Sequence, residues 1–147
     1  MIVAKTYLKI KEGFVDFCDF NGGFPDPEYV EGAVELSING VEILTKAMWD
    51  CVDQLWAYLA EGVICVAKGD DFKTYFPDQP IEISFSVRSG KVIVAVIVHE
   101  TVKVVVDQSE FVSGMKRLAV EFFEGLRSRG GAFEGSSDFY LSRLDSI

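Results

Sequence analysis

The sequence is poor in the residues that build catalytic and metal sites. It holds a single histidine, His99, so a metal site made of several histidines is excluded. Its three cysteines are an odd number without the spacing of metal ligands, and an all-cysteine zinc site needs a fourth thiol. We therefore expect reduced thiols, a cytoplasmic location, and no metal or other cofactor.

Long apolar runs are also missing. The longest, residues 92–98, is too short to cross a bilayer. Near the start of the chain, lysines alternate with apolar residues, and no apolar block precedes a small-residue cleavage site. We expect neither a signal peptide nor contact with a membrane.

Basic residues are few relative to acidic ones. The chain has 14 against 23, for a net charge of −9, which disfavours binding to nucleic acid and favours a basic protein partner. Residues 1–62 hold 11 acidic and 4 basic side chains, a balance of −7. A surface that only keeps the protein soluble is the alternative interpretation. The candidate partner-binding residues are Asp16, Asp19, Asp26, Glu28, Glu31, Glu35 and Glu42.

Residues 81–106 have the clearest β pattern of the chain. Residues 81–88 alternate apolar and polar side chains, as a half-buried strand does. Ser89-Gly90 supplies a turn, because glycine reaches the positive φ that tight hairpins need. Residues 92–98 are mostly β-branched and apolar on both faces, which predicts the most buried strand. A turn at His99-Glu100 then leads to a third strand, so we expect an antiparallel meander.

A second hairpin is predicted around Asn39-Gly40, the favoured pair for a type I′ turn. This turn places Ile38 opposite Val41, and counting outward pairs Leu36 with Ile43. The face that points away from the core is expected to carry Glu35, Ser37 and Glu42.

Apolar residues recur with a helical period from residue 45 or 46 to residue 61, and Gly62 is predicted to end this helix. Residues 63–67 are then expected to form a short strand. Trp49 and Trp56 are seven residues apart, so they should share one face of this helix. Packing of both rings on the sheet or its rim is favoured over an exposed aromatic anchor for a partner.

A second helix is predicted to begin after Asp107, with Glu110 completing a capping box. Gly130-Gly131 is its expected stop. The apolar stripe of this helix consists of Phe111, Met115, Leu118, Ala119, Phe122 and Leu126.

The two ends of the chain carry weaker patterns. Residues 2–11 predict a strand paired with residues 14–20, and a glycine- and proline-containing loop follows. Residues 132–147 predict a loosely docked tail with one short turn of helix. We expect one α+β domain, 1–147, in which residues 1–31 are the N-terminal strands and loop.

The predicted fold is one antiparallel sheet of about six to eight strands, with two amphipathic helices packed on one face.

No pattern in the sequence predicts a catalytic residue. His99 is expected in an exposed turn, and Cys51 on the buried stripe of the first helix. Asp70-Asp71 with Asp78 is the one local cluster of carboxylates, but it lacks the ligand alternation of a calcium-binding loop. Gly22-Gly23 does not join a strand to a helix, so it is not a phosphate-binding loop.

The order of elements resembles a group of known proteins. It consists of a strand hairpin, a Trp-containing helix, Phe76-Pro77-Asp78-Gln79-Pro80-Ile81, a valine-rich hairpin, and Val106-Asp107-Gln108-Ser109-Glu110-Phe111 leading into a helix. This order is similar to that of small acidic bacterial proteins of unassigned function, some akin to immunity proteins that neutralise polymorphic or contact-dependent toxins. The similarity covers roughly residues 34–129 and implies a cytoplasmic binding protein of bacterial origin. It transfers no site residues.

These observations favour a non-enzymatic interaction protein, immunity-like in kind, that binds a basic protein. A small-ligand binding module or an enzyme, with its pocket between sheet and helices, is the alternative function.

Overall fold

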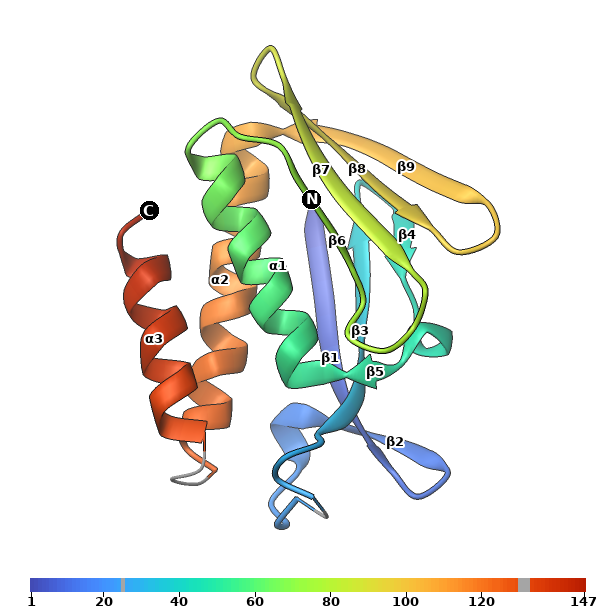
Figure 1. The fold of residues 1–147 in the computed structure, drawn as a ribbon, viewed down its shortest axis with the longest axis vertical. Helices are drawn as coiled ribbons and strands as arrows, with labels where there is room; N and C mark the ends of the chain where they lie inside the picture. The colour runs from blue at the N-terminus through green and yellow to red at the C-terminus, as the bar shows by residue number, and fades with distance from the viewer. Residues whose placement is uncertain (25, 130–132) are drawn as a thin grey trace.

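The computed structural model describes residues 1–24, 26–129 and 133–147, and these form nine strands and three α-helices (Figure 1). The strands are β1 (Ile2–Ile10), β2 (Gly13–Asp16), β3 (Glu31–Ile38), β4 (Val41–Leu44), β5 (Asp50–Cys51), β6 (Phe72–Tyr75), β7 (Glu82–Arg88), β8 (Lys91–Ile97) and β9 (Thr101–Asp107). The helices are α1 (Val52–Ala67), α2 (Gln108–Arg127) and α3 (Glu134–Asp145), with short 3-10 turns at Phe17–Asp19 and Lys46–Met48. No helix in these ranges is both long and apolar enough to span a membrane.

The strands form two antiparallel sheets. The first has the order β2-β1-β3-β4, with β5 also paired to β3, and the second has the order β6-β7-β8-β9. The α+β class with antiparallel strands is therefore confirmed, but the prediction of one sheet of six to eight strands with two helices is wrong. The α1 helix separates the sheets in the chain, and β4 approaches β8 and β9 without joining their hydrogen-bond ladder.

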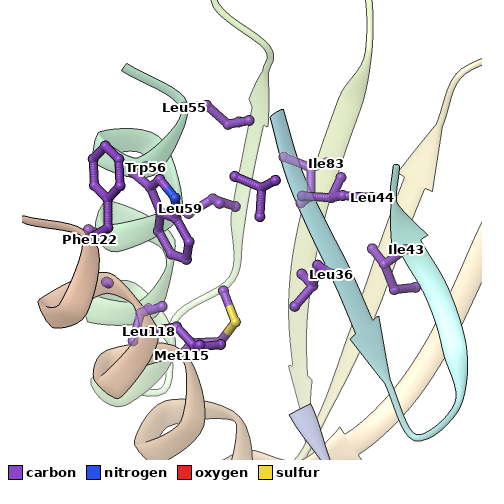
Figure 2. Close-up of a cluster of buried hydrophobic side chains, with 14 of the residues drawn as sticks. Leu36, Ile43, Leu44, Leu55, Trp56, Leu59, Ile83, Met115, Leu118 and Phe122 are labelled. Carbon is purple, nitrogen blue, oxygen red and sulfur yellow. The ribbon is translucent and has the colours of Figure 1, made fainter. Parts of the chain in front are cut away.

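The helices connect the two sheets through one core. The α1 helix contacts β3, β6 and β7, while α2 contacts β1, β8 and β9. Figure 2 shows Trp56 and Leu59 of α1, with Met115 and Phe122 of α2, on one side of this core and strand residues such as Leu36 on the other. Because the buried side chains form one cluster, each sheet depends on the helices to cover its apolar face.

The Asn39-Gly40 hairpin forms as predicted at its turn but not along its arms. Both residues have positive φ, 51° and 81°, and Ile38 pairs with Val41. Leu36 pairs with Leu44 rather than with Ile43, because a β-bulge shifts the register after Ser37. The extra residue in β4 allows Ile43 and Leu44 to be buried together, each 1% exposed.

The first helix was misplaced in the sequence prediction. Residues 46–51 form a 3-10 turn and β5, and α1 begins only at Val52 and runs through Gly62 to Ala67. The predicted strand at 63–67 is therefore its last turn, where Val63 and Val66 are fully buried. Trp49 precedes the helix and does not share a face with Trp56.

The meander of β7, β8 and β9 is confirmed, and the sheet extends by one further strand, β6, which was not predicted from the sequence. The central position of β8 is correct, but only one of its faces is fully buried, through Val92, Val94 and Val96. In β6, residues 72–75 pair with residues 82–85 of β7.

The α2 helix begins where predicted, and its apolar stripe is buried. The capping box is absent, because Asp107 makes no side-chain cap hydrogen bond and forms an ion pair with Lys91 instead. Glu110 contacts the amino group of Met1. The predicted stop at Gly130-Gly131 lies outside the described residues.

Both ends of the chain differ from their predictions. The strand predicted for residues 14–20 is limited to β2, since a 3-10 turn begins at Phe17. The C-terminal tail forms the helix α3 rather than one short turn. Leu144 of α3 is fully buried, and the Tyr140 ring stacks on Phe123 of α2 at 5.1 Å between centroids.

Candidate functional site: an acidic groove with aromatic walls

A pocket of about 380 Å³ forms where three segments that are distant in the sequence meet. These segments are the start of β3 with the loop before it, the turn that leads into β5, and the loop between β6 and β7. In Figure 1, the β6–β7 loop reaches down to β5. The pocket is lined by Tyr29, Glu31, Ala47, Trp49, Asp50, Asp78 and Gln79.

The buried carboxylate of Asp50 fixes the shape of this pocket. Asp50 is 2% exposed, and its oxygens accept hydrogen bonds from the backbone N–H of Asp78 at 3.1 Å, of Gln79 at 2.9 Å and of Cys51 at 2.6 Å. A buried carboxylate requires such donors, because transferring it from water without partners is very costly. The side chain of Asp50 therefore holds the β6–β7 loop against β5.

Two further contacts close the rim of the pocket. The amide of Gln79 donates to the backbone carbonyl of Trp49, and the hydroxyl of Tyr29 donates to the carboxylate of Asp78. The bond from Tyr29 to Asp78 raises the pKa of Tyr29 to about 12, since a neighbouring carboxylate disfavours the phenolate. The side chains of Tyr29 and Trp49 remain 43% and 37% exposed, so both can contact a ligand.

A second, smaller pocket of about 170 Å³ adjoins the first and shares Tyr29 and Glu31 with it. Lys9 lines this second pocket, and its ammonium lies 4.5 Å from the centroid of the Trp49 ring in a cation–π contact. We call the two pockets together the acidic groove. Its charged and aromatic residues are Lys9, Phe24, Asp26, Tyr29, Glu31, Trp49, Asp50 and Asp78.

The predicted partner-binding residues are dispersed. Some line this groove, some lie on the outer face of the first sheet, and Asp19 and Glu28 are exposed in the segment between β2 and β3. Asp26 and Glu31 line the groove, and Asp26 also accepts a hydrogen bond from the N–H of Glu28 at 3.0 Å. Glu35 and Glu42 share the outer face of β3 and β4, as predicted, since Glu42 pairs with Ser37 two residues beyond Glu35.

Lysines accompany the acidic residues on that outer face. Lys5 pairs with Glu35 across the strands and lies 4.0 Å from the carboxylate of Asp16. A hydrogen bond to Glu35 raises the pKa of Tyr7, and the ammonium of Lys46 lies 4.2 Å from the centroid of that ring. Asp19 is exposed in the 3-10 turn after β2. Two lysines thus partly neutralise the outer face, whereas the lining of the groove holds one lysine, Lys9, against four carboxylates.

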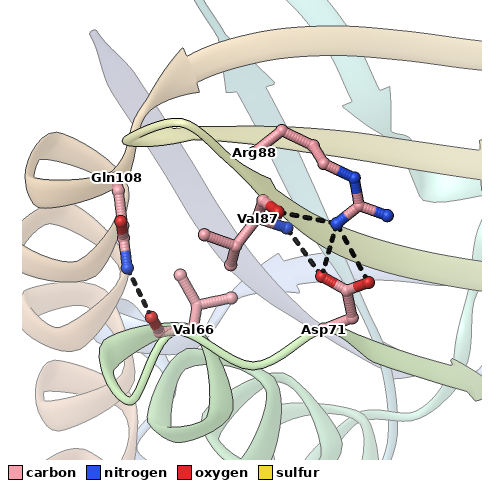
Figure 3. Close-up of polar contacts among 5 residues, drawn as sticks. All are labelled: Val66, Asp71, Val87, Arg88 and Gln108. Atoms are coloured by element: carbon pink, nitrogen blue, oxygen red, sulfur yellow. Dashed lines mark hydrogen bonds and ion pairs between the residues drawn. The ribbon is translucent and has the colours of Figure 1, made fainter.

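The structure separates the acidic residues that the sequence places together as Asp70-Asp71 and Asp78. Asp71 accepts hydrogen bonds from the N–H of Val87 at 2.8 Å and from Arg88 at 3.0 Å, and these contacts lower its pKa (Figure 3). Asp78 lies in the groove instead. Within the described residues, no group of three or more histidine, cysteine or carboxylate side chains is arranged to hold a metal ion.

The cysteine in the groove region is not arranged as a nucleophile. Cys51 is 1% exposed, and burial, with a hydrogen bond to Asp53, raises the pKa of its thiol to about 12. A nucleophilic cysteine needs the opposite shift, toward the thiolate. His99 lies in the exposed β8–β9 turn.

A larger and more open hollow, about 710 Å³, lies at the ends of the helices. Lys68 is its one ionised side chain, and the side-chain amide of Gln108 is already bonded to the carbonyl of Val66 at 2.8 Å (Figure 3). Fewer charged groups converge here than in the groove.

Asp50 and Tyr29 were not among the site residues predicted from the sequence, and Trp49 entered only through the less favoured alternative of an exposed aromatic anchor. The one signal in the sequence was that Asp50 stands between the apolar residues Trp49 and Cys51-Val52, because a charged residue that is buried there needs a partner.

Comparison of the chain with protein-family models, with curated proteins and with solved structures finds no match.

Proposed function

We propose that this chain is a non-enzymatic interaction protein, immunity-like in kind, that binds a basic protein partner at the acidic groove. The observation that carries the proposal is the convergence of four carboxylates and two half-exposed aromatic rings on one preformed groove. Among the described residues, none of the four forms a salt bridge with a lysine or arginine. They are Asp26, Glu31, Asp50 and Asp78.

The chemistry of the groove suits lysine and arginine side chains. A cation is attracted electrostatically by the carboxylates and by the faces of the Tyr29 and Trp49 rings, and both attractions become stronger as water is excluded. Because Asp50 already fixes the β6–β7 loop in the free protein, the loop loses little conformational entropy when a partner binds. The net charge of −9 adds long-range steering of a basic partner.

The outer face of the first sheet extends this surface. Glu31, Glu35 and Ser37 lie on the same side of β3, so Glu35 and Glu42 continue from the groove toward the hairpin turn. Lys5 and Lys46 reduce the contribution of this extension. We therefore rank the groove above Glu35 and Glu42 as the site of recognition.

A ligand pocket between sheet and helices is the alternative function, and one hollow lies in that position, between β1 and α2. Its volume of about 160 Å³ is below the roughly 300–1,000 Å³ typical of small-molecule pockets. The pocket beside Trp49 lies within that range, and so does the open hollow at the ends of the helices, where fewer charged groups converge. The groove is the better binding site.

The test measures binding of N-acetyl-arginine methylamide to the intact protein. NMR chemical shifts report the binding at low and at high salt. We expect saturable shifts at Tyr29, Trp49 and Gln79 that weaken with salt, and their loss in Glu31→Gln/Asp78→Asn. The reversal Glu35→Lys/Glu42→Lys should weaken binding less than this double variant does.

The matched control is Glu124→Gln/Glu134→Gln. It removes the same two charges from exposed positions on α2 and α3, on the helical side of the molecule (Figure 1). If it weakened binding as much as Glu31→Gln/Asp78→Asn, net charge alone would explain the affinity and the groove proposal would fail.

A further inference from the structure

We infer that the occupant of the acidic groove is an extended protein segment that carries two basic residues separated by one residue. This inference rests on the proposed function, and it specifies the form of the partner. The groove has two pockets that share Tyr29 and Glu31 in their lining, and each also has at least one carboxylate of its own. Asp26 lies in the smaller pocket, and Asp50 and Asp78 line the larger one.

The charge of the groove requires more than one cation. Three carboxylates of its lining are accessible, those of Asp26, Glu31 and Asp78, because Asp50 is buried and bonded to backbone N–H groups. With the ammonium of Lys9 the accessible balance is −2. A single arginine would leave half of this charge uncompensated and would occupy only one of the two pockets, whereas two arginines or lysines would neutralise it.

The protein's own Lys9 shows that the aromatic wall accepts an ammonium group. Its Nζ lies 4.5 Å from the centroid of the Trp49 ring, and it also donates to the carbonyl of Lys11 at 3.3 Å. The larger pocket thus already has one basic side chain on its aromatic wall, supplied from the neighbouring pocket. A partner's cation would use the same interaction on the same ring or on Tyr29.

The geometry points to an extended chain, because both pockets share the side chains of Tyr29 and Glu31 as their common wall. Two pockets that share two lining residues are close neighbours. In an extended segment, side chains i and i+2 point the same way and are about 6.6–6.8 Å apart. Successive turns of a helix would instead present side chains i and i+3 or i+4 along a rigid cylinder.

The experiment compares the binding of probe peptides to the intact protein, measured by tryptophan fluorescence and by NMR. The probes are N-acetyl-Arg-Gly-Arg-amide, the same peptide with four glycines between its arginines, N-acetyl-arginine methylamide, and spermidine. We expect the Arg-Gly-Arg peptide to bind at least ten-fold more tightly than the single arginine and to shift resonances in both pockets. Asp26→Asn should reduce this preference to about two-fold, and Lys9→Met should raise the affinity for the peptide.

The outcomes separate the two proposals. Binding of the single arginine at the groove without a gain from the second arginine would overturn this inference and leave the proposed function standing. Equal affinity for the widely spaced peptide, or for spermidine, would also overturn the extended segment as occupant. If no cationic probe bound at the groove at millimolar concentration, the proposed function itself would fail.

Discussion

The ring of Phe85 lies where a side chain on Gly62 would have to begin. A Cβ on Gly62 would be 2.4 Å from Cε2 of Phe85 and 2.8 Å from Cδ2 of Phe72, far inside ordinary carbon contact distances of about 3.5–4.0 Å. Phe85 is fully buried and cannot move outward without opening the core. The α1 helix therefore passes the second sheet at a distance that requires glycine.

Gly62→Ala should accordingly destabilise the protein by about 1–3 kcal/mol through overpacking. In an open helix the same change would stabilise by about 1 kcal/mol, because alanine has the higher helix propensity. Gly135→Ala in α3 is the matched control, since nothing lies within 4 Å of its added Cβ. Urea denaturation of both variants checks the prediction, which would be wrong if Gly62→Ala matched the control.

Asn39 connects the β3–β4 hairpin to the edge of the second sheet. Its φ is 51°, its N–H donates to the carbonyl of Met1 at 2.8 Å, and its side chain donates to the carbonyl of Val105 at 3.2 Å. Asn39→Pro should lower the melting temperature by several degrees, because proline holds φ near −65° and removes the N–H. Asn39→Gly keeps the turn and removes only the side-chain hydrogen bonds, so it should lower the melting temperature by less than Asn39→Pro does. A melting curve unchanged by proline would contradict the turn.

Asp50→Ala should destabilise the protein by roughly 3 kcal/mol or more, because it leaves three backbone N–H groups without their acceptor at about 1–3 kcal/mol each. Asp53→Ala serves as the comparison. Asp53 is partly exposed and accepts a hydrogen bond only from the weak thiol donor of Cys51 at 3.2 Å, so its loss should cost less than 1 kcal/mol. Similar unfolding midpoints for the two variants would refute the role assigned to Asp50.

Tyr29 should ionise later than an ordinary tyrosine. Its pKa is raised to about 12, from the ordinary value of 10.0, by its hydrogen bond to Asp78. Since the folded pKa is the higher one, the stability that this bond contributes is complete below pH 10 and is lost as the pH rises through about 12.

NMR of labelled tyrosine rings can follow each of the five tyrosines separately. In Asp78→Ala, the pKa of Tyr29 should return toward 10. The pKa values of Tyr7 and Tyr140 should stay raised, because a hydrogen bond to Glu35 raises the first and burial raises the second. An unchanged titration of Tyr29 would show that Asp78 does not hold its hydroxyl.

Val94 and Ala95 are neighbours on β8 that face opposite sides of the sheet. Val94 is fully buried, whereas Ala95 is partly exposed on the outer face. Val94→Asp should abolish cooperative folding, because it buries a charge without a partner in a marginally stable domain. Ala95→Asp should remain folded. Circular dichroism during heating distinguishes the two variants. A cooperative unfolding transition for Val94→Asp would contradict the burial of β8 in the core.

Several elements were determined by the sequence itself. The period-two pattern before Ser89-Gly90, the Asn39-Gly40 pair and the apolar stripe of α2 each specify a local conformation through side-chain spacing and backbone preference. These interactions are satisfied by residues close together in the chain, so the sequence analysis placed the meander, the turn and the second helix correctly.

Other features were decided only by the tertiary structure. Gly62 continues a helix because the close approach of Phe85 requires glycine there, although the same residue commonly ends helices. The strands divide into two sheets because α1 and α2 cover both, which no local period shows. The groove depends on a carboxylate whose partners lie 28 and 29 residues further along the chain. Hydrogen bonds over such separations form only when packing brings the segments together, so no local spacing could predict them.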